Sequence, residues 1–290
     1  MYLKFSIAAV TCAAVLSVAS LPSANATPYA YASNTITGLK VTNADGSLLT
    51  ASTATTSISN SAQFDGNPIS GFQARSNTAN GVTIQQAYSG PSATPAATYS
   101  PQTPGTFVGS RADATISAGW NTSAGVNVQN LAEGYGNALG NSNATNNAAI
   151  SFTVTGTGQA LRVSFSDVYQ LIASTATLVN ESANASIQTA FSITSGDSST
   201  PLFSFAPGAI NRQISSVAGT PSVTNVGLLT FLADTLTPIL TMGTSYNISL
   251  TSTATQTIQP GTAVPEPASM ALLGVSMIIF GMVRHRSMRG

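Results

Sequence analysis

The chain has 290 residues, only 6% of them charged, with nine Lys and Arg against nine Asp and Glu. Its one cysteine, Cys12, and its one histidine, His285, lie near the two ends, so the region between them has no disulfide framework and no histidine-ligated metal site. That central region, residues 27–263, carries eight acidic and five basic side chains, a net charge of about −3. Without a basic cluster it is not expected to bind nucleic acid.

The first 26 residues predict a secretory signal peptide. Lys4 gives the positive start, residues 5–21 form an apolar run, and Ala24 and Ala26 are the small residues that a signal peptidase reads before Thr27. We therefore expect the chain to be exported and cut after Ala26. Because Cys12 lies in the removed segment, the mature protein is expected to contain no cysteine.

Residues 27–258 predict an exported all-β domain. Residues 150–155 and 161–166 alternate between apolar and polar side chains on either side of a Gly-Thr-Gly-Gln turn at 156–159, which predicts a hairpin. Residues 168–177 fit either a short helix or a continuation of the second strand. Many antiparallel strands with little helical periodicity favour a jelly-roll-like antiparallel β-sandwich. Further strands are predicted at residues 35–42, 82–88, 112–118, 187–194, 202–205, 228–232 and 246–258.

Three segments predict connections instead of strands. Residues 89–105 hold four prolines among Ser, Thr and Ala, which favours an extended loop. Residues 138–147 are dense in Asn, Ser and Gly and predict an exposed loop between two strands. Residues 259–264 predict a linker that joins the β domain to the C-terminal segment.

The central region shows no recognisable catalytic motif, and we expect no catalytic residue, metal or cofactor in it. The histidine lies outside this region, which excludes a Ser-His-Asp triad. Two carboxylates would suffice for glycoside hydrolysis, but none of the eight acidic residues lies in such a motif. The pairs Asp45-Gly46 and Asp65-Gly66 favour plain β-turns, because they lack the ligand spacing of a calcium loop.

Two aromatic residues are candidates for contact with a sugar. Trp120, the only tryptophan, and Tyr135 flank glycine-containing sequence and would offer rings on which a carbohydrate stacks. Packing in the core or at a sheet edge is the interpretation that the pattern favours. Both alternatives stay open at this point.

The C-terminal segment predicts a membrane-held tail. Pro265-Glu266-Pro267 precedes an apolar run at residues 268–283, and Arg284, Arg286 and Arg289 follow it as a basic stop on the cytoplasmic side. A helix of these residues is about 24 Å long, shorter than a hydrocarbon core of about 30 Å. It still spans a bilayer that thins locally, or one in which the flanking charges snorkel. The alternatives are a plain anchor or a buried core helix.

The tripeptide, the apolar helix and the basic end, in that order at the terminus, resemble the PEP-CTERM sorting signal of bacterial surface proteins. The resemblance covers residues 265–290 and agrees with the signal peptide, but the central region carries no such likeness. It implies a Sec-exported protein of a Gram-negative bacterium, held transiently in the inner membrane. It also implies recognition at the tripeptide by an exosortase, a membrane cysteine transpeptidase, and a final place on the cell surface or in the extracellular matrix.

Three functions follow as hypotheses for the exported domain. The first is a non-enzymatic surface or extracellular-matrix protein displayed through exosortase processing. The second is a carbohydrate-binding module that holds exopolysaccharide through aromatic faces. The third, which the sequence favours least, is a secreted hydrolase that uses a carboxylate pair.

Overall fold

The computed structural model describes residues 27–261 apart from the short segments 50–52, 71–75, 78–80, 93–97, 103–104, 117–124, 137–138, 154–157, 176–179, 197, 199 and 218–221. Residues Thr27–Gly261 form one compact unit with its own hydrophobic core. The predicted signal peptide and the predicted C-terminal membrane helix lie outside the described residues. Among the residues that are described, no helix is long and apolar enough to cross a membrane.

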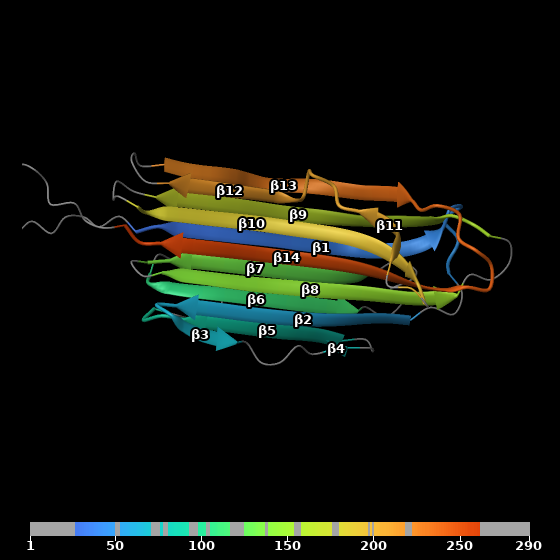
Figure 1. Cartoon of the computed structure of the whole chain (residues 1–290), viewed down its shortest axis with the longest axis horizontal. Helices are drawn as coiled ribbons and strands as arrows, with labels where there is room; N and C mark the ends of the chain where they lie inside the picture. Colours follow the sequence, from blue (N-terminus) through green and yellow to red (C-terminus); the bar gives the residue numbers. More distant parts are fainter. Residues whose placement is uncertain are drawn as a thin grey trace, which may run out of the picture. The chain divides into compact units, whose positions relative to one another are not determined.

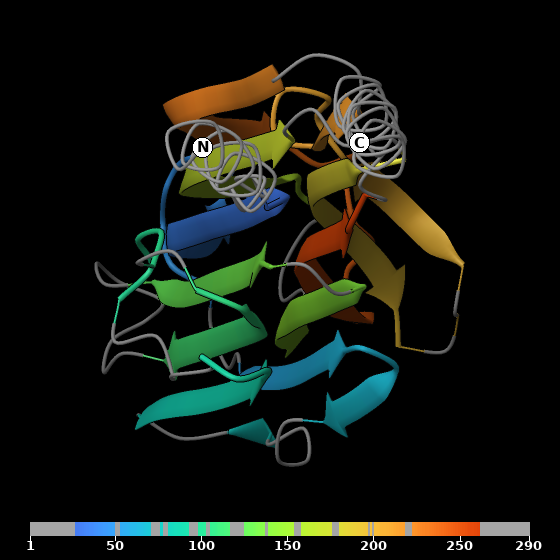
Figure 2. The ribbon, with the colours of Figure 1, turned by 90° about the vertical axis from the view of Figure 1, so that its left-hand side faces the viewer.

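The domain is an antiparallel β-sandwich, as predicted, and its described part contains only strands and connections (Figures 1 and 2). One sheet, sheet A, has the order β13-β9-β1-β7-β6-β5. Its strands are β1 (Tyr29–Asn43), β5 (Gly81–Ser89), β6 (Phe107–Ile116), β7 (Val126–Tyr135), β9 (Leu161–Thr175) and β13 (Ser222–Leu236).

The second sheet, sheet B, has the order β11-β10-β14-β8-β2-β3, with β12 beside β10 and β4 beside β2. Figure 2 shows the two sheets as separate layers that face each other. The strands of sheet B are β2 (Thr53–Phe64), β3 (Asn67–Ser70), β4 (Ser76–Asn77), β8 (Gly140–Thr153), β10 (Ser182–Ser195), β11 (Pro201–Phe205), β12 (Arg212–Val217) and β14 (Ser245–Gln259).

Alternation of side chains builds the core between the two sheets. In β9 every second residue from Leu161 to Thr175 is buried, and the residues between them are half-buried or exposed. Successive side chains of a strand point to opposite faces of the sheet, so such a strand presents one face to the core and one to the outside. The core cluster draws its members from both sheets, for example Leu171 and Ile36 from sheet A and Ile187 and Leu250 from sheet B.

The predicted hairpin between residues 150–155 and 161–166 is wrong. Both runs contribute to strands, but β8 pairs with β14 and β2 in sheet B, whereas β9 pairs with β1 and β13 in sheet A. The chain therefore passes from one sheet to the other between β8 and β9. Alternation identifies the buried face of each strand, and it does not identify the partner strand. Of the two alternatives for residues 168–177, the strand is the correct one through Thr175.

The predicted loop at residues 138–147 is also wrong, because from Gly140 onward this segment is strand β8. Its Asn-rich composition reflects the outer face of sheet B, where Asn141 is exposed and Asn143 half-buried. The residues that alternate with them, such as Ser142 and Ala144, are buried against sheet A. The proline-containing segment after β5, by contrast, has no strand among its described residues, as predicted.

Candidate functional site

A polar cluster lies on the outer face of sheet A, beneath the segment that connects β5 to β6. The hydroxyl of Tyr31 bonds to the carbonyl oxygen of Tyr99 and lies 2.8 Å from Ser33 Oγ. The Arg111 guanidinium carbon lies 5.0 Å from the centroid of the Tyr99 ring, a distance typical of a cation–π contact. Arg111 also forms an ion pair with Asp113, with 2.6 Å between Nη2 and Oδ2. Tyr99 of this connection is therefore attached to the sheet beneath it.

Glu133 is the buried acid of this cluster. Its Oε1 accepts hydrogen bonds from the Tyr29 hydroxyl and from the Gln102 backbone N–H, each 2.8 Å long. Burial raises the pKa of the Glu133 carboxyl to about 7, against the lowering effect of those two hydrogen bonds. Its second oxygen, Oε2, has no hydrogen-bond partner among the described residues. A carboxyl with a pKa near neutrality can exchange a proton at physiological pH, but here Gln102 and Tyr29 cover it.

A second buried acid, Asp167, points from β9 into the core. Burial raises the pKa of its carboxyl to about 6, and the nearby Asn34 amide opposes the rise. Neither oxygen of Asp167 accepts a hydrogen bond from any described residue. The side chain is completely buried, so no substrate dissolved in water reaches it in this conformation.

Hydrogen bonds between buried side chains join the two sheets near Asp167. Asn34 Nδ2 donates to Ser252 Oγ at 2.7 Å, and Asn130 Nδ2 donates to the same oxygen at 3.0 Å. Asn130 also donates to Asn34 Oδ1 at 3.1 Å. Because Asn34 and Asn130 belong to sheet A and Ser252 to sheet B, the bonds fix the register of one sheet against the other.

The outer face of sheet B is a neutral surface of hydroxyl and amide groups. Strands β2, β8, β14 and β10 contain no charged residue at all. On β14, Thr251, Thr253, Thr255 and Thr257 form a row at every second position, about 7 Å apart. Such a surface can exchange hydrogen bonds with a neutral polar ligand, and it offers nothing to attract an ionic one.

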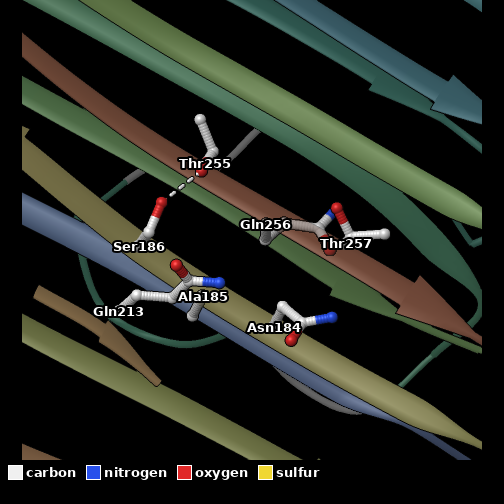
Figure 3. Close-up of a pocket in the computed structure, with 7 residues that line it drawn as sticks. All are labelled: Asn184, Ala185, Ser186, Gln213, Thr255, Gln256 and Thr257. Carbon is white, nitrogen blue, oxygen red and sulfur yellow. Dashed lines mark hydrogen bonds between the residues drawn. The ribbon is translucent and has the colours of Figure 1, made fainter. Parts of the chain in front are cut away.

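This neutral face contains a shallow hollow of about 100 Å³ (Figure 3). Ser186 on β10 and Thr255 on β14 lie side by side in it, with 2.6 Å between their hydroxyl oxygens. Every side chain around it is neutral, so the hollow carries no acid, base or charged nucleophile. It is lined by Asn184, Ala185, Ser186, Gln213, Thr255, Gln256 and Thr257.

The structure describes only some of the residues predicted to be functional. Tyr135 lies on β7, where its ring centroid is 5.7 Å from that of Tyr29, so it takes part in an aromatic contact at the sheet surface. Trp120, the cleavage residues Ala24 and Ala26, the tripeptide at 265–267 and the three C-terminal arginines lie outside the described residues.

The two predicted turns occur as turns. Asp45 Oδ1 accepts hydrogen bonds from the Ser47 backbone N–H and from its hydroxyl, which closes the local turn. Asp65 and Gly66 join β2 to β3 with φ angles of 49° and 75°. Positive φ at both central residues is the geometry of a two-residue type I′ hairpin, for which Asp-Gly is a preferred pair. Among the described residues, no group of three or more His, Cys, Asp or Glu side chains is placed to hold a metal ion.

Neither Glu133 nor Asp167 belongs to a motif that marks it as functional in the sequence. The burial of Asp167 could have been predicted from the sequence, because Asp167 lies at one of the alternating positions of β9 whose side chains face the core. Glu133 carried no comparable signal, because a loop distant in sequence from Glu133 covers it.

Comparison with known proteins adds a finding for the C-terminus alone. No curated protein matches the chain. Residues 263–287 match the PEP-CTERM protein-sorting motif. The match includes the Pro-Glu-Pro tripeptide, the apolar run and two of the three arginines, Arg284 and Arg286. The chain thus carries a PEP-CTERM sorting motif, the mark of an exported protein that is sorted by an exosortase.

Proposed function

We propose that this protein is a non-enzymatic component of the bacterial cell surface or extracellular matrix, delivered there through its PEP-CTERM motif. The observation that carries the proposal is the match of residues 263–287 to that motif. In this route the Sec system exports the chain, signal peptidase cuts after Ala26, and the segment 268–283 holds it transiently in the inner membrane. An exosortase then recognises Pro265-Glu266-Pro267 and releases the domain to the surface.

The physical features of the tripeptide support its role in recognition. Each proline fixes φ near −65° and biases the residue before it toward an extended backbone, so the sequence predicts a rigid, extended tripeptide. Glu266 is the only charged residue between Asp234 and Arg284, which makes it a distinctive group for a complementary pocket.

The placement of the acidic side chains supports a non-enzymatic role. Asp113 and Asp234 are ion-paired with Arg111 and Arg162. Asp167 is enclosed in the core, away from any solvent-borne substrate. Two of these three carboxylates are thus engaged by arginines, and the third is out of reach of the solvent.

Replacement of Glu266 by Gln tests the proposed route, because the change keeps the shape of the side chain and removes its charge. We expect the Glu266→Gln protein to stay full-length in the inner-membrane fraction. The matched control is Ile278→Leu in the apolar run, which should be processed like the parent. If Glu266→Gln protein reaches the surface with the parent's mass and yield, the tail is a simple anchor and the proposed route is wrong.

A carbohydrate-binding role is the second candidate, and the neutral face of sheet B favours it. Hydroxyl and amide side chains on four uncharged strands are suited to a neutral polysaccharide, whose own groups are hydroxyls.

Binding of the domain to insoluble cellulose and to dextran beads tests this role. We expect Thr257→Glu, beside the hollow, to reduce retention at least fivefold, and Thr37→Glu on sheet A to leave it unchanged. Trp120→Ala tests separately whether an aromatic face takes part. Retention that none of these variants alters would contradict a specific site.

A further inference from the structure

Strand β13 forms an open edge of sheet A. Within the described part of the chain it pairs only with β9, so its other side presents unpaired backbone N–H and C=O groups. The edges of sheet B are short and interrupted by comparison. They are formed by β3, β4, β11 and β12, which have 4, 2, 5 and 6 residues, and β3 and β11 each include a proline. At 15 residues, β13 is the longest of these edge strands.

The composition of β13 does not protect this edge. Native proteins usually prevent edge-to-edge pairing with lysine, proline or a bulge along the exposed strand. β13 contains no lysine, arginine or proline. Its one irregularity lies between Val226 and Leu229, and the eight residues from Leu229 to Leu236 pair regularly with β9. This regular part is about 27 Å long, enough for a further strand to pair with it.

Large apolar side chains are exposed along the same strand. Leu228, Leu232 and Leu236 are 71%, 75% and 56% exposed. Leu232 lies opposite Ser166 and Leu236 opposite Arg162, both on the outer face of sheet A. The irregularity places Gly227 and Leu228 together opposite Gln170, which is on that outer face as well. The three leucines therefore form a single row.

The leucines of this row are placed symmetrically about Leu232. Counting every second position, it runs Leu228, Thr230, Leu232, Asp234, Leu236, with Leu at both ends and at the centre. In an antiparallel pair related by a two-fold axis, residue i of one copy faces residue j of the other, and j faces i. An axis at Leu232 places Leu232 against its own copy, Leu228 against Leu236, and Thr230 against Asp234.

The charges agree with this pairing. Asp234 is the one charged residue of β13, and Arg162 on the neighbouring strand neutralises it, with 2.7 Å between Nε and Oδ1. In the pairing centred on Leu232 each Asp234 faces a neutral Thr230. Two like charges directly opposite each other would oppose cross-strand pairing, and this pairing brings none together.

From these observations we infer that the partner of β13 is a second copy of this chain, joined edge to edge as a two-fold antiparallel dimer centred on Leu232. Sheet A of one copy then continues into sheet A of the other. Backbone hydrogen bonds pair the open edges, and the leucine rows cover each other. The interface is short, so the association is reversible and depends on concentration.

Sedimentation of the exported domain, residues Thr27–Gly261, tests the inference. We expect a monomer–dimer equilibrium between about 1 μM and 1 mM, the concentrations that correspond to weak and moderate affinities. Leu232→Lys and Leu232→Glu should each weaken the dimer at least tenfold, because each places like charges opposite one another. An equimolar mixture of the two variants should restore dimers, because opposite charges then meet at the axis.

The matched control is Leu202→Lys, which changes a leucine of similar exposure, 54%, on the edge strand β11 and should have no effect on association. Circular dichroism checks that each variant is folded, and Leu228→Lys replaces Leu232→Lys if the latter is not. The inference is overturned if the parent stays monomeric at 1 mM or forms open-ended polymers. It is equally overturned if Leu202→Lys weakens association as much as Leu232→Lys, or if the mixture does not restore dimers.

Discussion

Replacement of Asp167 by Asn should favour the stability of the domain, relative to the parent, more strongly at pH 7.5 than at pH 4. The carboxyl is completely buried, and burial raises its pKa from 3.8 to about 6. In the unfolded chain the group ionises near its ordinary pKa. Between pH 4 and 6 the folded protein therefore binds more protons than the unfolded chain does. It follows that the contribution of Asp167 to the free energy of unfolding falls as the pH rises through this window and is constant above it.

The size of the effect follows from the pKa difference. One pKa unit corresponds to 1.36 kcal/mol, so the shift costs the folded state about 3 kcal/mol above pH 6. The substituted side chain carries no charge at any pH. It does bring an amide that needs hydrogen-bond partners, and this cost of about 1–3 kcal/mol is the same at both pH values. Because the unfolded carboxyl is already partly ionised at pH 4, the effect of the substitution differs between pH 4 and pH 7.5 by about 2–3 kcal/mol.

Urea denaturation of the parent and of Asp167→Asn at pH 4 and pH 7.5 measures this difference. The control is Asp234→Asn, on the adjacent strand. Arg162 lowers the pKa of the exposed Asp234 carboxyl, so loss of this acid should slightly reduce stability at neutral pH. If Asp167→Asn has the same effect at both pH values, the Asp167 carboxyl is not held in a desolvating environment and the reasoning fails.

Three further predictions concern Glu133, the hydrogen bonds between the sheets and the N-terminus. Burial raises the pKa of Glu133 from 4.5 to about 7, so Glu133→Gln should be more stabilising at pH 8 than at pH 4.5; equal effects in urea denaturation would contradict this. Asn130→Ala removes the donor to Asn34 and Ser252 and should cost about 1–3 kcal/mol; an unchanged denaturation midpoint would show that the bonds add nothing. N-terminal sequencing of the exported protein should begin at Thr27, and a retained Met1 would refute the predicted cleavage.

The composition and side-chain alternation were sufficient to predict an antiparallel β-sandwich. In β9 and β14 the alternation is regular over 15 residues, so the buried face of each strand can be read directly from the sequence. Pairing was not predictable from the same signal, since an alternating strand fits any partner whose apolar face points the same way. For this reason the strands around residues 150 and 166 were placed in one hairpin, although they belong to different sheets.

The first part of strand β8, residues 140–147, is predicted as a loop because its polar residues are typical of loops. Asn and Gly are depleted in strands generally, but on the outer face of sheet B an uncharged polar side chain is what contacts the solvent. The polar cluster around Glu133 could not be predicted from the sequence, for a different reason. It depends on the contact of Gln102 with a residue 31 positions away, which no local pattern encodes. By contrast, the sorting motif is a short contiguous sequence, and its presence can be predicted from the sequence alone.

The intact mass of the protein recovered from the cell surface tests the central claim most directly, because it reports both processing events together. The account predicts a chain that begins at Thr27 and has lost the apolar run at residues 268–283 with the basic end behind it. A surface protein whose mass corresponds to a chain extending from Thr27 through Gly290 would show that the motif is not processed. That result would contradict exosortase sorting of this protein.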